Sequence, residues 1–350
     1  MINYLIIASF AVVLSLGLTP IMIFMSRKWN VLDIPNERKA HNKPMPLMGG
    51  VAIYLATMLA TVLYLWIFNT QVRVNIAVAF FIGISGVTMM GLIDDILSLS
   101  ARRRLVILFI LALIVLVGCL QFYFPADLFQ TDIVLAVVTS IIIVLWIVGI
   151  TNAINFTDGL DGLASCLSLV SALGFAVIFY LQGRYQLALP TTVALCGAIL
   201  GFLAYNISPA EIFMGDAGSM FLGFMLGILS IMSISQKSII VFVVPIFLML
   251  LPIMDMGMAV LRRMILKAPL MKPDKMHFHH MLIKRIKSQR VVVFLLAAIQ
   301  ICFAAIGIVI YINEFYYEGW LTLAVIAVAA VIYTINKALA IKKTKISESN

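Results

Sequence analysis

Long apolar runs alternate with short polar breaks along nearly the whole chain. The runs contain between 15 and 24 residues, and about 20 apolar residues are enough for one α-helical crossing of a bilayer. A helix spanning a membrane satisfies all of its backbone hydrogen bonds internally, which favours helices over isolated strands here. The pattern therefore predicts about eleven transmembrane helices, at Ile2–Met25, Leu47–Phe68, Ile76–Ile93, Leu105–Phe124, Ile133–Ile150, Leu163–Leu181, Leu187–Tyr205, Met220–Ile234, Ile239–Leu261, Val291–Ile312 and Trp320–Ile335.

The composition agrees with this pattern and excludes a water-soluble globule. Hydrophobic residues make up 63% of the 350 positions and charged residues only 11%, whereas soluble domains are about 45–50% apolar. No basic residue precedes Arg27, so the first run lacks the charged start of a cleaved signal peptide and is interpreted as a retained helix. We expect an all-α polytopic membrane protein, with one membrane domain over residues 1–340 and a basic cytoplasmic tail over residues 341–350.

The basic residues indicate which way the chain crosses the membrane. If the N-terminus is outside, 21 of the 24 Lys and Arg residues fall on the inner side, and only Arg73, Arg184 and Lys237 fall outside. Cytoplasmic loops carry such an excess of positive charge. The sequence thus predicts an outside N-terminus and a cytoplasmic C-terminus. This distribution of basic residues also explains the net charge of +9, so no nucleic-acid partner is needed to account for it.

The acidic residues outside the apolar runs concentrate on the same predicted inner side. The only acidic residues of the outer loops are Asp127, Asp132, Glu314 and Glu318. No internal repeat is visible in the sequence. The four cysteines lie in apolar stretches without metal-ligand spacing, so a disulfide framework or zinc site is not expected. We therefore expect the function to reside at the inner face of the membrane.

Two inner segments combine charge with possible anion or metal chemistry. In the first inner loop, cations including Lys43 precede Gly49 and Gly50. This arrangement suits an anion held near backbone amides, but equally suits a simple membrane anchor with a tight turn. Asp94 and Asp95 end the third run. Adjacent carboxylates at a membrane edge invite Mg²⁺ or a proton, although an ordinary acidic helix end remains an alternative.

Two further inner segments are rich in oxygen-bearing side chains. Asn152, Asn155, Asp158 and Asp161 lie close together in a glycine-containing stretch. Four such groups match the needs of a hard cation, a sugar or a base, whereas a polar turn is the plainer interpretation. The next segment contains Asn206, Phe213 and Asp216. The glycine-flanked Asp216 could hold a metal beside phosphate-binding amides, or could simply cap a helix.

The last long inner loop contributes basic and imidazole groups. It contains Arg262, Arg263, His277, His279 and His280. Hydrogen bonding to phosphate or sugar explains these groups better than zinc does, because no cysteine is nearby and the acids elsewhere are hard ligands. A solvated basic loop would explain the arginines but not three histidines within four positions.

Taken together, these segments resemble a known enzyme family. RKAHNKPMP followed by GG, then GLIDD, NAINFTDGLDGLA, NISPAEIFMGDAGS and PDKMHFHH, occur in this order on alternate inner loops. They resemble the polyprenyl-phosphate N-acetylhexosamine-1-phosphate transferases of glycosyltransferase 4 type. The PDKMHFHH ending is more similar to the bacterial undecaprenyl-phosphate N-acetylglucosaminyl-1-phosphate transferases than to the muramyl-pentapeptide branch. One departure is Ser98, where the family often has a third aspartate.

The resemblance implies a reaction, a cofactor and a location. An undecaprenyl phosphate would attack the β-phosphorus of UDP-N-acetylglucosamine, releasing UMP and starting a polymer such as teichoic acid or O-antigen. The implied cofactor is Mg²⁺, with Mn²⁺ as an alternative. The implied setting is the bacterial cytoplasmic (inner) membrane, with the active site on the cytoplasmic face and a homodimeric assembly.

The resemblance also implies roles for individual residues. Asp216 would be the main Mg²⁺ ligand, with Asp94 and Asp95 near the metal or the lipid phosphate and either of them a candidate base. A base need not contribute much, because a phosphate is largely ionised at neutral pH. The nucleotide-sugar pocket would be lined by Asn152, Asn155, Asp158, Asp161, Asn206 and Phe213, with Phe213 stacked on uracil. The pyrophosphate or sugar would be contacted by His277, His279 and His280 with Arg262 or Arg263.

Other functions remain open at this point. The same chemistry could use another UDP-N-acetylhexosamine or UDP-N-acetylmuramyl pentapeptide. A secondary transporter is also possible, because acids within membrane segments often mark ion paths. Against a transporter, the carboxylates lie at helix ends and no inverted repeat is visible.

Overall fold

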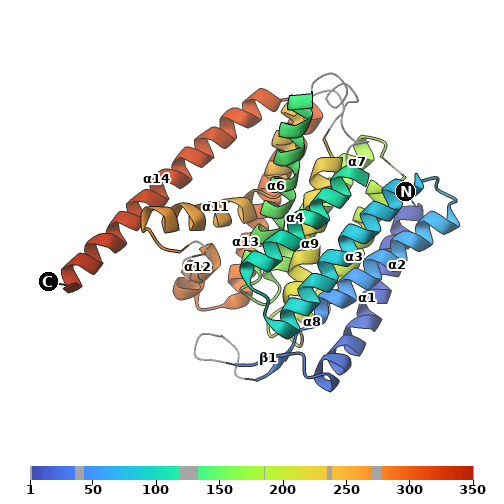
Figure 1. Ribbon diagram of the computed structural model, residues 1–350, viewed down its shortest axis with the longest axis horizontal. Helices are drawn as coiled ribbons and strands as arrows, with labels where there is room; N and C mark the ends of the chain where they lie inside the picture. The colour runs from blue at the N-terminus through green and yellow to red at the C-terminus, as the bar shows by residue number, and fades with distance from the viewer. Residues whose placement is uncertain are drawn as a thin grey trace.

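The computed structural model describes residues 2–35, 43–118, 133–184, 186–234, 239–269 and 277–349. Within these residues the protein is a bundle of α-helices with one short two-stranded ribbon (Figure 1). The elements are α1 Ile2–Lys28, β1 Leu32–Asp33, β2 Met45–Pro46, α2 Gly49–Ile67, α3 Val74–Leu97, α4 Ala101–Gly118, α6 Ile133–Thr157, α7 Leu163–Leu181, α8 Ala188–Asn206, α9 Gly215–Met232, the 3₁₀ turn η2 Ile239–Phe242, α10 Val243–Leu248, α11 Leu250–Ile265, α12 Phe278–Ile286, α13 Gln289–Asn313 and α14 Tyr316–Ser349.

Helix α9 forms the centre of the bundle. In its most apolar 18-residue window, 94% of the residues are buried, against 11% for α14. Helices α2, α3 and α6 pack around α9. Glycines on α9 allow this close approach: Gly218 lies against Gly50 of α2, and Gly223 and Gly227 lie against Thr151 and Ile147 of α6. The start of α9 is therefore fixed by packing inside the protein.

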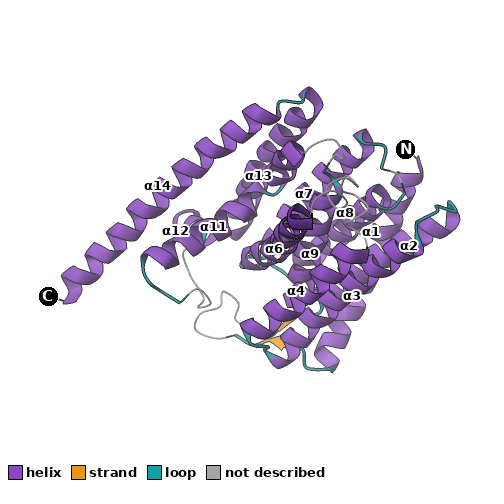
Figure 2. Cartoon of the chain, turned by 45° about the horizontal axis from the view of Figure 1, so that its top comes forward, coloured by secondary structure: helices purple, strands orange, loops and turns teal. Residues whose placement is uncertain are grey.

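Helix α14 occupies the opposite extreme. It lies at the edge of the molecule, and its C-terminal end extends beyond the bundle (Figures 1 and 2). The helix continues to Ser349, through the residues that the sequence assigned to a basic tail. Large apolar side chains on it are exposed, among them Leu321, Val325 and Val328. Since an apolar helix surface is stable in hydrocarbon, this face is suited to lipid.

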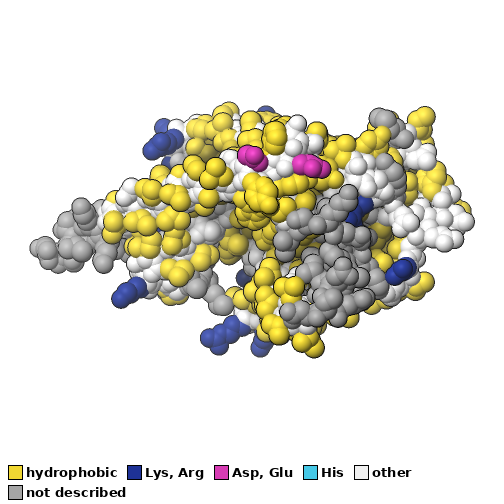
Figure 3. Space-filling view, turned by 90° about the horizontal axis from the view of Figure 1, so that it is seen from above, with side chains coloured by type: hydrophobic (Ala, Val, Ile, Leu, Met, Phe, Trp, Pro, Cys, Tyr) yellow, Lys and Arg dark blue, Asp and Glu magenta, His cyan; other side chains and the backbone are white. Residues whose placement is uncertain are grey.

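Within the described residues, nine helices are long and apolar enough to cross a membrane, or ten if one bent pair counts as a single span. The nine correspond to nine of the eleven predicted runs. These helices make the chain a multi-pass membrane protein. Seen from above, the surface is mostly hydrophobic, with few charged side chains among the residues described there (Figure 3).

The two remaining predicted runs explain why a count of eleven is not reached. The run Leu105–Phe124 falls on α4, whose first turn carries three arginines, and residues 119–132 lie outside the described residues. Helix α4 nevertheless packs between α3 and α6. The run Ile239–Leu261 falls on α10 and α11, which meet at an angle of 88°. Hydropathy detects the apolar length of such a segment but not a bend within it.

The bend between α10 and α11 is held by polar side chains from other helices. Gln300 of α13 is fully buried and donates to the Leu248 carbonyl at 2.6 Å, while its own oxygen accepts from the Leu251 amide at 3.1 Å. Ser171 of α7 donates to the same Leu248 carbonyl at 2.7 Å. A break in a helix surrounded by apolar groups leaves backbone groups unpaired, and these contacts satisfy them.

Candidate active site

A cavity of about 950 Å³ opens where helix ends meet at one end of the bundle. It lies between the C-terminal end of α3, the loop after α6, the start of α9, the β1–β2 ribbon and α12. Eight of the predicted site residues line it: Asp94, Asp95, Asp158, Asp161, Asn206, Phe213, Asp216 and His280. Segments that are more than 180 residues apart in the sequence thus form one site.

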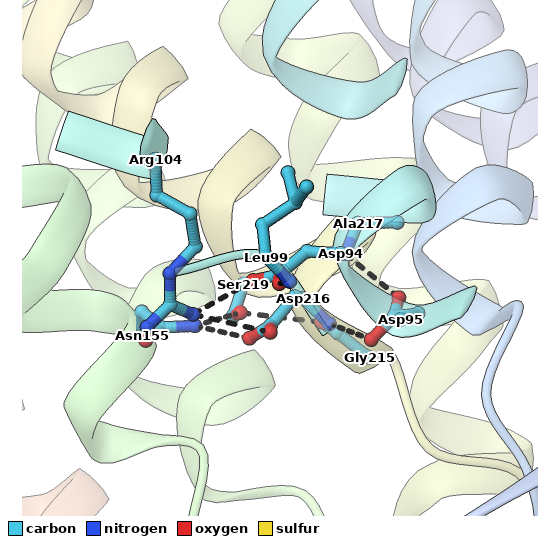
Figure 4. A network of polar contacts seen from close by, with 9 residues as sticks. All are labelled: Asp94, Asp95, Leu99, Arg104, Asn155, Gly215, Asp216, Ala217 and Ser219. Carbon is cyan, nitrogen blue, oxygen red and sulfur yellow. Dashed lines mark hydrogen bonds and ion pairs between the residues drawn. The ribbon is translucent and has the colours of Figure 1, made fainter. Parts of the chain in front are cut away.

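An arginine joins the carboxylates at the centre of this site (Figure 4). One nitrogen of Arg104, in the first turn of α4, lies 2.7 Å from Asp94 Oδ2 and 3.4 Å from Asp216 Oδ2. The side chain of Asp94 is only 3% exposed, and its other oxygen accepts from the Leu99 amide at 2.6 Å. Burying such a carboxylate requires a paired cation, and Arg104 provides it.

An asparagine on α6 fixes the other side of Asp216. Asn155 Nδ2 donates to Asp216 Oδ1 at 2.7 Å and to Ser219 Oγ at 2.8 Å. Asn155 does not line the cavity, although the sequence placed it in the nucleotide-sugar pocket. Its observed contact is with the predicted metal ligand, so it orients Asp216.

Asp95 has different neighbours from Asp94. Its two carboxylate oxygens accept hydrogen bonds from the Asp216 amide at 2.8 Å and from the Ala217 amide at 3.1 Å. These amides belong to the first turn of α9, which begins at Gly215. The two adjacent aspartates therefore contact different parts of the protein.

The loops after α6 and α8 are tied to each other and to the ribbon. Asp161 Oδ2 accepts from the Ala210 amide at 3.2 Å. Asn206 is buried, accepting from Ser165 Oγ at 2.9 Å and donating to the Ile212 carbonyl at 3.0 Å. The amide of Phe213 donates to the Pro46 carbonyl at 2.9 Å. These bonds hold Phe213 and Asp161 at the cavity wall.

Electrostatics single out Asp158 on this wall. Its side chain is open to the cavity, but protein surrounds it on the other sides. This desolvation, together with repulsion from Asp216 and Asp161, raises the pKa of Asp158 to about 7. Such a group gains from a cation or a hydrogen-bond donor, and a sugar or base can supply a donor.

The histidine segment is anchored to the bent helix α11. Asp255 is buried and accepts from His277 Nδ1 at 3.0 Å and from the Phe278 amide at 2.9 Å. The rings of His277 and His279 are stacked, with centroids 5.7 Å apart and planes 7° apart. His280 lines the cavity beside them. Asp255 thus holds the start of α12 so that this segment faces the site.

His279 is enclosed, and its Nε2 has no hydrogen-bond partner among the residues that the structure describes. Its ring lies against Gly159, leaving no room for a side chain at that position. Burial, followed by the nearby ring of His280, lowers the pKa of His279 to about 4. The imidazole is therefore neutral at physiological pH and joins α12 to the loop after α6.

The other predicted site residues do not line the cavity. Lys43 is exposed, and Asn152 donates to the Val148 carbonyl of its own helix. Arg262 and Arg263 are buried, and the guanidinium of Arg263 lies 5.9 Å from the ring centre of Phe156. The remaining cations of the first inner loop, and the Asp274–Lys275 pair of the PDKMHFHH motif, lie outside the described residues.

Sequence reasoning missed two central residues, Arg104 and Asp255. Arg104 belongs to a run of three arginines that was interpreted only as a mark of the inner side. Its position directly before the predicted run Leu105–Phe124, ten residues after Asp94, was the available signal. Asp255 lies within the predicted run Ile239–Leu261, where a lone acid needs a partner, but the sequence does not reveal His277 as that partner.

The donor set at Asp94 and Asp216 fits a hard divalent cation. In the described part of the chain, no three His, Cys, Asp or Glu side chains converge as a ready-made metal site. However, one nitrogen of Arg104 contacts both carboxylates. A single cation placed between the two acids could therefore contact both of them. Oxygen ligands of this kind, completed by phosphate and water, are those that Mg²⁺ prefers.

Comparisons with known proteins give the family. Residues 77–234 match the family described as "Glycosyl transferase family 4". A Bacillus subtilis protein named "Probable undecaprenyl-phosphate N-acetylglucosaminyl 1-phosphate transferase" is 38% identical over 84% of this chain and 81% of its own length. The Mycolicibacterium smegmatis decaprenyl-phosphate N-acetylglucosaminephosphotransferase is 34% identical over 77% of this chain and 72% of its own.

A more distant relative represents the other branch. The Streptococcus mutans phospho-N-acetylmuramoyl-pentapeptide-transferase is 32% identical over 60% of this chain and 66% of its own length. The similarity to the Bacillus subtilis protein extends over a larger part of both chains. The motifs that line the cavity and the extent of these matches lead to one conclusion: the chain belongs to glycosyl transferase family 4.

Proposed function

We propose that the protein transfers N-acetylglucosamine 1-phosphate from UDP-N-acetylglucosamine to undecaprenyl phosphate and releases UMP. The observation that carries this proposal is the cavity at the helix ends, which is lined by Asp94 and Asp216, the two acids that Arg104 joins. The names of the most extensively matching relatives support the choice of donor and acceptor. The product would be the first lipid-linked intermediate of a cell-envelope polymer such as teichoic acid or O-antigen.

The reaction exchanges one phosphoanhydride bond for another. An oxygen of the lipid phosphate forms a bond to the β-phosphorus of the donor, and the bond from that phosphorus to the bridging oxygen breaks. UMP leaves with the electron pair. The attacking phosphate is largely ionised at neutral pH, so the protein's main task is to align and neutralise several negative charges.

The central residues suit this task. Asp94 and Asp216 would hold Mg²⁺, or Mn²⁺ in its place, and a bound ion would supply Lewis-acid stabilisation of the phosphate charges. Arg104 would bind a phosphate oxygen once the carboxylates engage the ion, because its side chain is 30% exposed and its guanidinium contacts both acids. Asn155 would keep the Asp216 carboxylate oriented throughout.

The donor would occupy the cavity. A volume of about 950 Å³ lies within the range of about 300–1,000 Å³ typical of small-molecule sites. Phe213 would stack on uracil, with Asp158 and Asp161 accepting hydrogen bonds from donor hydroxyl or ring N–H groups. His280 and the buried His279 would border the sugar and pyrophosphate, and Asn206 would act by holding the loop that carries Phe213.

The same proposal includes location and assembly. The distribution of Lys and Arg supports an outside N-terminus and an active site on the cytoplasmic face of the bacterial inner membrane. We also propose that the protein forms a homodimer, on the basis of the family resemblance. Labelling of single cysteines placed beyond Ile335 and in the loop before α3, in intact cells and in broken membranes, tests the orientation.

The activity is tested with purified protein in detergent or bilayers, undecaprenyl phosphate and donors labelled in the sugar. Label should enter the lipid phase from UDP-N-acetylglucosamine, with an equal amount of UMP released. EDTA should abolish the reaction, and excess Mg²⁺ or Mn²⁺ should restore it. Asp216→Asn serves as the inactive control.

The alternatives give different results in the same tubes. Label from UDP-N-acetylmuramyl pentapeptide alone would keep the family and assign the protein to the other branch. Label from a different UDP-N-acetylhexosamine alone would change only the sugar. Movement of a solute across sealed vesicles without UMP release would indicate a transporter instead.

A further inference from the structure

We propose that Asp95 is a positioning residue: from the end of α3, its carboxylate holds the first turn of α9 and thereby places Asp216. This inference rests on the proposed function for the identity of the reaction. The sequence and the resemblance leave the two aspartates interchangeable, as metal ligands or as bases. The structure distinguishes them by what each carboxylate contacts.

Both oxygens of Asp95 are engaged by backbone amides. Oδ1 accepts from Asp216 at 2.8 Å and Oδ2 accepts from Ala217 at 3.1 Å. The first amides of a helix have no acceptor within the helix itself. The residue at the N-cap position of α9, Met214, makes no side-chain cap. Asp95 therefore performs from α3 the capping that a local Ser or Asp usually performs.

Helix electrostatics favour this arrangement. A carboxylate at a helix N-terminus faces the positive end of the helix dipole. Gly215 and Ala217 in the first turn of α9 are buried, so their backbone has little contact with water. An uncapped start would therefore leave buried amide groups unsatisfied.

Two glycines make the contact between α3 and α9 possible. Gly215 has a φ of +69°, and a side chain there would collide with the Asp95 carboxylate and with the Leu47 carbonyl. Gly91, one turn before Asp95, lies against the backbone of Asp216 and Ala217, where a Cβ would come within 2.6 Å of Ala217 Cα. The backbone of both helices is thus shaped for this approach.

Capping by Asp95 decides where Asp216 lies. The amide of Asp216 is held by Asp95 while its carboxylate is directed to Asn155 and Arg104 (Figure 4). Asp94 pairs with the same Arg104. Loss of the Asp95 contacts would leave the Asp216 and Ala217 amides without these acceptors. It would thereby shift the neighbouring Asp216 carboxylate relative to Asn155 and Arg104.

The test compares isosteric amides at the two positions, Asp95→Asn and Asp94→Asn, in the full-length protein. Amide hydrogen exchange is measured on peptides covering residues 212–220, with peptides from α8 as the internal reference. In Asp95→Asn, one acceptor oxygen remains while the amide nitrogen faces a backbone donor. We expect exchange in the α9 peptide to accelerate about tenfold, the loss of one charge-assisted hydrogen bond. Asp94→Asn should leave that exchange within about twofold of the wild type.

Activity measurements separate positioning from chemistry. Asp95→Asn should reduce kcat and raise the Mg²⁺ concentration for half-maximal activity, because Asp216 is displaced, while the pH at which activity falls stays unchanged. Asp95→Glu retains two carboxylate oxygens, so it should recover part of kcat and part of the response to Mg²⁺. It also serves as the second variant if Asp95→Asn does not fold. Unchanged exchange in the α9 peptide, or loss of the acidic limb of the pH profile in Asp95→Asn, would overturn the proposal. Absence of transfer in the wild type would refute the proposed function, whereas the exchange result would still decide the capping.

Discussion

Removing the guanidinium of Arg104 is the most direct perturbation of the candidate site. Arg104→Met keeps the length of the side chain but leaves Asp94 and Asp216 without the cation that lies 2.7 Å and 3.4 Å from them. A hydrogen bond to a charged group contributes about 1.5–3 kcal/mol. Because Arg104 is 30% exposed, solvent screening reduces this contribution, and about 1–2 kcal/mol is a fair expectation for the first contact. The second, longer contact adds less.

This energy translates into a measurable loss of transfer. A change of about 1.4 kcal/mol is tenfold, so kcat/KM for UDP-N-acetylglucosamine should fall about 5- to 30-fold in Arg104→Met. The loss is larger if the guanidinium also binds a phosphate in the transition state. Arg104→Lys should retain more activity than Arg104→Met, since it restores a positive charge without the planar fork.

The matched control lies next to the target. Arg103 is in the same helical turn but is exposed, so Arg103→Met removes the same charge from the chain without changing the network. It should stay within about twofold of the wild type. Equal losses in Arg103→Met and Arg104→Met would refute the reasoning, because the effect would then be one of general charge and not of the two contacts.

Three further predictions concern the metal ligand, a buried histidine and the helix bend. Asp216→Asn should lose most turnover while keeping the elution profile and melting temperature of the folded protein, and near-normal activity would remove Asp216 from the metal site. The unfolded chain protonates His279 near its usual pKa of 6.5 and the folded protein only near a pKa of about 4, so the free energy of unfolding should fall as pH drops through this window, by about 3 kcal/mol in total. His279→Gln should flatten that dependence, and an unchanged slope in thermal melts between pH 7 and pH 4 would contradict the assignment. Gln300→Leu should lower the free energy of unfolding by about 1–3 kcal/mol, since the Leu251 amide loses its acceptor. The control is Gln289→Leu, because Gln289 lines the cavity and does not contact the bend. Equal melting temperatures for the two variants would show that Gln300 does not stabilise the bend between α10 and α11.

Hydropathy predicted most of the fold because it measures a property that each segment has by itself. Nine of the predicted runs became candidate spans. It failed at α10 and α11, where the direction of the chain depends on a side chain far away in the sequence. Gln300 is a single polar residue in an apolar run, and nothing in that run indicates that its amide satisfies Leu248 and Leu251.

The candidate site was predicted in the same uneven way. Residue type and motif order predicted that Asp94, Asp158, Asp216 and His280 belong to one site. All four line one cavity. Their partners were not predictable, because orientation within a cluster depends on packing. Arg104 had a sufficient explanation as a topology signal, and the different contacts of Asp94 and Asp95 arise only when α3 meets the start of α9.

The positions of the helices that carry the site fit the demands of a reaction between a water-soluble donor and a membrane lipid. Asp216 lies at the start of α9, the helix most completely enclosed by the others, so protein packing sets its position. Asp94 lies near the end of α3, beside Ile96 and Leu97, which are exposed. The cavity-lining acids and an exposed apolar stretch thus belong to the same helix end. On the proposed function, we expect the lipid phosphate to reach Arg104 from this helix end while the nucleotide sugar occupies the cavity. The charged groups that the proposed reaction needs are thus located at helix ends, where Arg104 pairs with both carboxylates and offsets the cost of placing them beside apolar segments.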